Sequence, residues 1–302
     1  MNLELIKKYT GNIAIVGKPN VGKSTLINAI FNQKISIINQ KPQTTRNKID
    51  AVFSNQEFQI NFIDTPGFHI PKNKLDIFLN SEAKASLKQA DIVYFLSDIT
   101  RPIDEEDMEL LDFVKSYKVP HVILVITKAE TSTQKNIDQR IQEWNKIFSF
   151  NKDIIISALH KINIDKLLDI SKEYLSYLDV VEYEDNSTLQ EDNFLVREII
   201  REQCLNLLKQ EIPYGIAIVI EKSNYDAVNN SFNIDASIVV EKESQKSIVI
   251  GKNGSMIKQI GIESRKELLN IYDSKINLKL FVKVDKNWRD NELKLKEFGY
   301  FK

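Results

Sequence analysis

The chain has 302 residues, 42% of them hydrophobic and 27% charged, with a formal net charge of −1. This length suits two domains of an ordinary globular protein, and the apolar runs are too short for the ~20 residues that a membrane helix needs. A single cysteine, Cys204, excludes an intrachain disulfide and fits a reducing compartment. The charge is unevenly spread, because residues 242–302 hold fourteen Lys or Arg against eight Asp or Glu. We therefore expect a basic C-terminal part that binds a polyanion.

The first motif lies between a predicted strand at 13–16 and a predicted helix at 25–31, where residues 17–24 read G-K-P-N-V-G-K-S. This spacing matches the phosphate-binding P-loop, G-x-x-x-x-G-K-[ST], in the strand-to-helix context that supports it. Its two glycines allow the backbone N–H groups to surround phosphate oxygens. We expect Lys23 to reach the β- and γ-phosphates and Ser24 to bind Mg²⁺. A fortuitous glycine-rich turn is the alternative.

The next motif follows two predicted strands, 49–53 and 58–63, and reads D-T-P-G at residues 64–67. In a P-loop protein, an aspartate at the tip of a buried strand is placed to hold the Mg²⁺ shell. We therefore expect Asp64 to serve the metal and the Gly67 N–H to face the γ-phosphate.

Strands and helices then alternate along the chain. Strands are expected at 92–96, 122–126 and 154–156, and helices at 75–90, 104–117, 136–148 and 164–177. This alternation predicts an α/β fold with a doubly wound, mostly parallel sheet. The motifs fall at the carboxyl ends of strands, where such sheets bind ligands.

Five motifs in this order resemble the G domain of translation-factor-type GTPases. The segments 17–24, 43–46 (Q-T-T-R) and 64–67 resemble the Era family of bacterial ribosome-assembly GTPases. That resemblance implies binding of GTP or GDP with Mg²⁺, and it implies that Thr45 completes the Mg²⁺ coordination. It also implies that S-A-L at 157–159 backs the guanine base through its backbone.

The chain departs from the family pattern N-K-x-D at residues 127–130, which read T-K-A-E. Glu130 keeps the carboxylate that accepts both guanine N–H donors, whose loss would cost about 1–3 kcal/mol, but it is one methylene longer. Thr127 lacks the amide that braces the P-loop, whereas Lys128 is retained. We expect guanine preference with weaker discrimination.

A second departure concerns hydrolysis. Ras-like GTPases place a glutamine after the switch II glycine to orient the attacking water, and this chain has Phe68 there. Intrinsic turnover should then be slow, or help must come from elsewhere. Asn20 is a candidate, since the resemblance implies a potassium ion held by an asparagine at this position. The alternative is that Asn20 merely closes the loop turn.

These arguments define the predicted site. The nucleotide-binding residues are Gly17, Asn20, Val21, Gly22, Lys23, Ser24, Thr25, Asp64, Thr127, Lys128, Glu130, Ser157, Ala158 and Leu159. The metal ligands are Ser24, Thr45 and Asp64, and the catalytic residues are Lys23, Thr45 and Gly67.

Beyond an acidic stretch at 179–193, residues 248–258 read I-V-I-G-K-N-G-S-M-I-K. The predicted order is helix (194–209), strands (214–220 and 234–240), helix, G-x-x-G, helix and strand (276–284), as in a type II KH domain. Its G-x-x-G loop clamps about four nucleotides of single-stranded nucleic acid. Taken alone, this motif fits a plain helix–turn–helix better, and it is the apolar residues on both sides of it and the strand at 276–284 that favour the KH interpretation. The predicted RNA-binding residues are Gly251, Lys252, Asn253, Gly254 and Lys258.

The resemblance to the Era family therefore covers essentially the whole chain. We predict a GTPase domain at 1–178, a linker at 179–193 and a KH domain with a C-terminal helix at 194–302. The family implies a GTP-hydrolysing factor that binds the 3′ end of small-subunit (16S) ribosomal RNA and promotes maturation of the 30S subunit. The alternative is a nucleotide-gated RNA-binding switch with little hydrolysis. We expect a cytoplasmic monomer that binds no DNA, with peripheral association at the inner face of the cell membrane left open.

Overall fold

The computed structural model describes residues 5–39, 46, 49–64, 73–181, 187–188 and 193–300. These residues form two compact units, described separately below. The first unit includes the described residues up to 188 apart from 37–39 and 73–78, which belong with 193–300 in the second unit.

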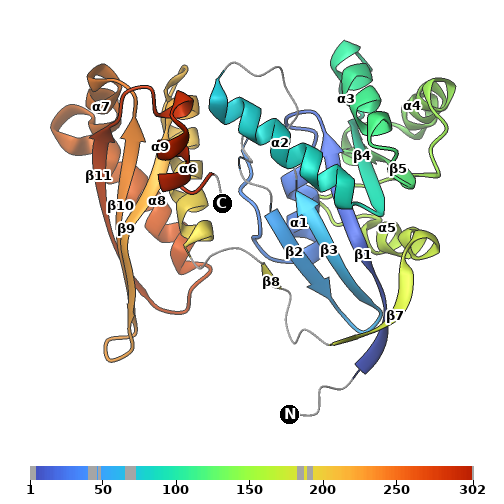
Figure 1. The fold of residues 1–302 in the computed structure, drawn as a ribbon, viewed down its shortest axis with the longest axis horizontal. Helices are drawn as coiled ribbons and strands as arrows, with labels where there is room; N and C mark the ends of the chain where they lie inside the picture. The colour runs from blue at the N-terminus through green and yellow to red at the C-terminus, as the bar shows by residue number, and fades with distance from the viewer. Residues whose placement is uncertain are drawn as a thin grey trace. The chain divides into compact units, whose positions relative to one another are not determined.

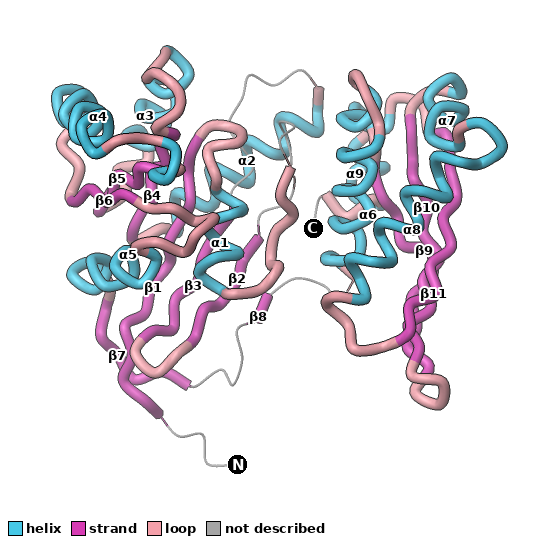
Figure 2. Tube along the Cα trace, turned by 180° about the vertical axis from the view of Figure 1, so that it is seen from behind, coloured by secondary structure: helices cyan, strands magenta, loops and turns pink. Residues whose placement is uncertain are grey.

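A mixed, mostly parallel sheet forms the centre of the first unit, in the order β6-β5-β4-β1-β3-β2-β8, with β7 pairing with β1 (Figure 1, and Figure 2 for β6). The parallel strands are β1 (Leu5–Gly17), β3 (Phe58–Asp64), β4 (Ile92–Asp98), β5 (His121–Thr127) and β6 (Lys152–Ile155). The antiparallel strands are β2 (Ile49–Ser54), β7 (Ser176–Val181) and β8 (Ser187–Thr188). Strand β4 is buried at every position, as its continuous apolar run predicts for a central parallel strand.

Helices cover both faces of this sheet (Figure 2). Apolar side chains of α2 (Lys74–Gln89), α3 (Glu105–Ser116) and α4 (Gln134–Ile147) pack with alternate residues of β1, β4 and β5 in one core cluster. On the opposite face, α1 (Lys23–Phe31) contacts β3 through the edge-on pair of Phe31 and Phe62. Helix α5 (Ile164–Ser171) contacts β4 through a hydrogen bond between the hydroxyls of Ser171 and Tyr94. The doubly wound arrangement predicted from the sequence is confirmed.

The predicted helix 164–177 is too long. Helix α5 ends at Ser171, a 3₁₀ turn follows at Lys172–Tyr174, and β7 then pairs with the first half of β1. The ring of Tyr177 packs 4.9 Å from that of Tyr9 on the paired strand. A cross-strand contact with a segment far away in sequence thus overrides the local helical spacing. Strands β7 and β8 also enter the range 179–193 that the sequence assigned to a linker.

The second unit has a smaller sheet in the order β11-β10-β9. Strands β9 (Ala217–Asp226) and β10 (Ser231–Val240) are antiparallel, and β11 (Lys275–Val284) runs parallel to β10. Helices α6 (Phe194–Leu207), α7 (Glu243–Ile250) and α8 (Ser255–Leu269) complete the order predicted for a type II KH domain, and α9 (Glu292–Glu297) follows. Buried side chains from α6, α7, α8 and the three strands share one core.

Two residues of this unit are packed in its interior. The Cys204 thiol is buried, which raises its pKa to about 12, so it remains a protonated core thiol. The Trp288 indole N–H donates to the Gly215 carbonyl at 3.2 Å, and its ring stacks on Tyr300 with the ring centroids 5.8 Å apart. Trp288 is therefore a packing residue. Within the described part of the chain, no helix has the length and apolarity needed to cross a membrane.

Candidate functional site

The P-loop follows β1 and leads into α1, as its sequence predicts. A Cβ atom on Gly17 would lie 2.6 Å from the Val21 side chain and 3.0 Å from the Leu96 Cβ, so only glycine fits at the end of β1. Gly22, which caps α1, and Asn20 both have left-handed backbone angles, with φ values of 109° and 65°. The loop therefore curls back toward its own start, where the Val21 N–H donates to the Lys18 carbonyl at 3.4 Å.

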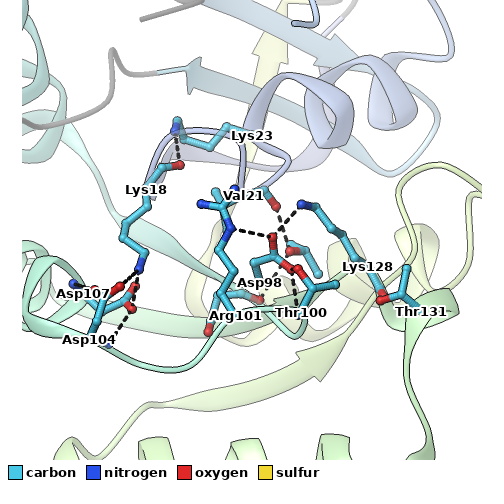
Figure 3. A network of polar contacts seen from close by, with 12 residues as sticks. Lys18, Val21, Lys23, Asp98, Thr100, Arg101, Asp104, Asp107, Lys128 and Thr131 are labelled. Carbon is cyan, nitrogen blue, oxygen red and sulfur yellow. Dashed lines mark hydrogen bonds and ion pairs between the residues drawn. The ribbon is translucent and has the colours of Figure 1, made fainter. Parts of the chain in front are cut away.

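Lys23 is buried inside this curl. Its ammonium donates to the Gly17 carbonyl at 2.7 Å and to the Lys18 carbonyl at 2.9 Å, and Figure 3 shows the bond to Lys18. Burial lowers the pKa of Lys23 to about 8, and the charge of Asp64 opposes the shift. The loop thus holds a cation that lacks bulk hydration, which an anionic phosphate would stabilise.

Ser24 and Asp64 come together because β1 and β3 are parallel neighbours, with Asp64 in register with Ile15. The Ser24 hydroxyl lies 3.5 Å from the Asp64 Oδ2, and the Asp64 side chain is buried at the end of β3. Hydroxyl and carboxylate oxygens are the ligands that Mg²⁺ prefers, so this pair fits the metal. The other residues assigned to this chemistry, Thr45, Gly67 and Phe68, lie outside the described residues.

Thr127 braces the P-loop, although it lacks the amide of the family pattern. Its hydroxyl, at the end of β5, donates to the Val21 carbonyl at 2.7 Å and lies 3.3 Å from the Ser97 carbonyl. The Thr127 hydroxyl therefore contacts the P-loop in place of the amide of the family pattern. A hydroxyl supplies the one donor that the Val21 carbonyl needs.

Lys128 lies beside a carboxylate that the sequence analysis did not identify. Its ammonium pairs with the Asp98 Oδ2 at 2.5 Å, while the Asp98 Oδ1 accepts from the Thr100 N–H at 2.9 Å and the Thr100 hydroxyl at 2.7 Å (Figure 3). Burial by itself raises the pKa of Asp98, but the bonds from Lys128 and Thr100 outweigh it and hold the pKa below its usual value. The ammonium of Lys128 is thereby held at the strand edge. In the sequence, Asp98 could have been identified as a site residue from its place at the end of a buried strand.

The segments assigned to the base lie at the ends of β5 and β6. Glu130 is exposed in the 3₁₀ turn Ala129–Thr131, and the Ala129 N–H donates to the Ile156 carbonyl at 3.2 Å, which joins this turn to the 157–159 segment. Ser157 is buried and bridged to Ile162, whereas Leu159 is 70% exposed. The structure thus places the predicted base-binding segments side by side.

Lys18, a variable position of the P-loop motif, is paired with two further carboxylates. Its ammonium lies 2.8 Å from carboxylate oxygens of both Asp104 and Asp107, which form the capping box of α3 (Figure 3). These pairs tie the loop to the start of α3. No local pattern in the sequence indicates these pairs, because α3 lies more than eighty residues downstream.

In the second unit, residues 251–254 connect α7 to α8. Gly251 has a φ of 74°, and a Cβ atom there would lie 2.7 Å from the Met256 Cβ and 2.8 Å from its N atom. The side chains of Lys252, Asn253 and Lys258 are exposed around this turn. The predicted RNA-binding residues therefore form one accessible loop and helix start, where backbone phosphates can approach closely.

Comparison with known proteins defines the class. Residues 12–128 match the model of a family described as 50S ribosome-binding GTPase, and residues 211–289 match the KH domain. With the P-loop geometry above, these matches define a P-loop GTPase that carries a C-terminal KH domain.

The relatives define the family. The chain is 49% identical to the GTPase Era of Ureaplasma urealyticum serovar 10, over 98% of this chain and 99% of that protein. It is 41% identical to the GTPase Era of Clostridium beijerinckii, over 96% of this chain and 97% of that protein. A crystal structure of Era in complex with MgGDPNP and nucleotides 1506–1542 of 16S ribosomal RNA superposes with a TM-score of 0.92 at 37% identity, covering 97% of this chain and 99% of that one. The chain belongs to the GTPase Era family and is accordingly a GTP-hydrolysing enzyme.

Proposed function

We propose that this GTPase binds the 3′ end of small-subunit ribosomal RNA through its KH loop and uses GTP binding and hydrolysis to promote maturation of the 30S subunit. The observation that most supports this proposal is the near-complete match to an Era structure solved with a segment of 16S ribosomal RNA. The exposed loop of residues 251–254 provides the surface for the RNA backbone.

The nucleotide phosphates would bind inside the P-loop. The buried ammonium of Lys23 would neutralise charge on the β- and γ-phosphates, and the loop N–H groups would donate to their oxygens. Ser24 and Asp64 would hold Mg²⁺, with Thr45 added when the γ-phosphate is present. When bound there, Mg²⁺ would supply positive charge to the phosphate oxygens.

The guanine base would lie against the segments at 127–130 and 157–159. Glu130 would accept the two guanine N–H donors, and the stem of Lys128, whose ammonium pairs with Asp98, would lie over the ring. Because the Glu130 side chain is exposed before nucleotide binds, its ordering would cost side-chain entropy that reduces selectivity.

Hydrolysis by the protein alone should be slow, since Phe68 offers no hydrogen bond to the attacking water. Asn20 has a left-handed backbone angle, which supports its role in closing the loop. That backbone role is compatible with a second role for its side chain, and we propose that this side chain helps to hold a potassium ion. We further propose that the protein works as a monomer that reaches the membrane at most peripherally.

Phosphate release from GTP by the full chain tests the proposal. It would be measured in potassium and in sodium buffer, each with and without an RNA of the 1506–1542 segment. We expect potassium and the RNA each to raise turnover. The Lys252→Asp, Asn253→Asp double variant should lose the response to RNA. Equal turnover with this RNA and with an unrelated RNA of the same length would contradict the proposed partner.

A further inference from the structure

A buried serine contacts the carboxylate assigned to the metal. The Ser36 hydroxyl donates to the Asp64 Oδ2 at 3.1 Å, and both side chains are buried, with exposures of 1% and 0%. The Ser24 hydroxyl lies 3.5 Å from the same oxygen. Since a carboxylate only accepts, the two hydroxyls direct their protons at Asp64, and the Ser24 lone pairs stay available for a cation.

The backbone around Ser36 is itself held by a side chain of α1. The Asn28 Oδ1 accepts from the N–H groups of Ile35 at 2.8 Å and Ser36 at 2.9 Å. The Asn28 Nδ2 donates to the Ser36 carbonyl at 2.8 Å. One amide therefore satisfies both backbone polar groups of Ser36 and fixes the position from which its hydroxyl reaches Asp64.

Asn28 also lies on the same face of α1 as Ser24, one helical turn further on. The helix that presents one proposed metal ligand thus also fixes, through Ser36, the orientation of the other ligand on β3. A carboxylate at a strand end can rotate about its side-chain bonds, and hydrogen bonds to the oxygen fix its orientation.

We propose that Asn28 and Ser36 are positioning residues that orient Asp64 for Mg²⁺. This inference rests on the proposed assignment of the metal to Ser24 and Asp64. Removing such a partner from a metal ligand typically costs 10–100-fold in metal affinity. A merely structural role would instead lower the stability of the fold and leave the response to Mg²⁺ unchanged.

Dissociation of fluorescently labelled GDP from the full chain tests the proposal. The rate is measured across a Mg²⁺ titration and in EDTA, and the readout is the Mg²⁺ concentration at which dissociation is half-maximally slowed. Ser36→Ala should raise this concentration about 10–100-fold while leaving the rate in EDTA within about twofold of wild type. Ser36→Thr retains the hydroxyl and should lie closer to wild type.

Ser86→Ala is the matched control, because Ser86 is equally buried and its hydroxyl bonds to the Glu82 carbonyl of its own helix at 2.8 Å. Asn28→Ala is the second test, because it keeps the Ser36 hydroxyl but removes the side chain that holds the Ser36 backbone. It should also raise the Mg²⁺ concentration needed to slow GDP dissociation. It decides the matter if Ser36→Ala does not fold.

Three results would overturn the proposal. The first is a folded Ser36→Ala variant whose half-maximal Mg²⁺ concentration equals that of Ser86→Ala. The second is a Ser36→Ala variant that releases GDP faster than wild type by the same factor with and without Mg²⁺. The third is a wild-type protein whose GDP dissociation ignores Mg²⁺. That third result would also remove the proposed metal site, whereas the first two would leave it intact.

Discussion

Nucleotide binding should take up a proton above pH 7, because Lys23 is buried in the P-loop of the nucleotide-free protein. Its pKa of about 8 lies below the ordinary value of 10.5, a shift worth about 3 kcal/mol against the charged form. A bound phosphate would restore the charge and raise the pKa again. At pH 8.5 roughly three quarters of the free protein carries neutral Lys23, against about a quarter at pH 7.5.

Titration calorimetry with GDP and Mg²⁺ checks this linkage when each pH is run in two buffers of different ionisation enthalpy. The number of protons taken up should rise from about 0.25 at pH 7.5 to about 0.75 at pH 8.5, and affinity should fall over the same range. The Lys23→Arg variant should take up none, since a guanidinium stays charged. Uptake that does not change between the two pH values would refute the reasoning about Lys23.

The lowered pKa of Lys23 also determines how the stability of the nucleotide-free fold changes with pH. A lysine whose pKa is lower in the folded state leaves the unfolded chain with more bound protons between pH 8 and pH 10.5. The contribution of Lys23 to stability therefore rises with pH across that window. Below pH 8 both states are protonated, and the cost of burying the charge is constant.

Three further predictions concern separate parts of the chain. Thr127→Val should weaken nucleotide binding and lower the free energy of unfolding by about 1–3 kcal/mol, because it leaves the buried Val21 carbonyl without its donor. Thr127→Ser keeps the hydroxyl and should restore most of the nucleotide affinity and most of the stability, as measured by GDP titrations and thermal melts. Glu130→Ala should erase the preference for GTP over ATP in competition binding, and equal wild-type affinities would show that this segment does not read guanine. The Lys252→Asp, Asn253→Asp variant should bind single-stranded RNA at least about tenfold more weakly in 0.1 M salt with an unchanged circular dichroism spectrum, and unaltered RNA affinity would disprove the KH loop as the contact.

The sequence was most informative where a motif is local. The P-loop combines a strand, two glycines and a helix within a few residues, so its position between β1 and α1 can be predicted from those residues alone. The G-x-x-G turn between α7 and α8 is local in the same way. Patterns of this kind need no knowledge of which segments become neighbours in space.

Side-chain partners from distant segments could not be predicted. Asp98 meets Lys128 because β4 and β5 pair in parallel with Asp98 opposite Thr127, a register that no local pattern encodes. Likewise, the Thr127 hydroxyl reaches Val21 only through the order of strands in the sheet. The sequence assigned the start of β7 to a helix and its end to a linker, because the pairing of β7 with β1 joins segments about 170 residues apart.

The central claim, a GTPase whose KH domain binds the 3′ end of small-subunit ribosomal RNA, is tested most directly by crosslinking in growing cells. The protein would be crosslinked to total RNA, purified and its bound sequences read out, beside the Lys252→Asp, Asn253→Asp variant. The account predicts that wild-type reads concentrate in the 3′-terminal segment equivalent to nucleotides 1506–1542 and that the variant loses this peak. Wild-type reads spread evenly over ribosomal RNA, or concentrated on another RNA, would contradict it.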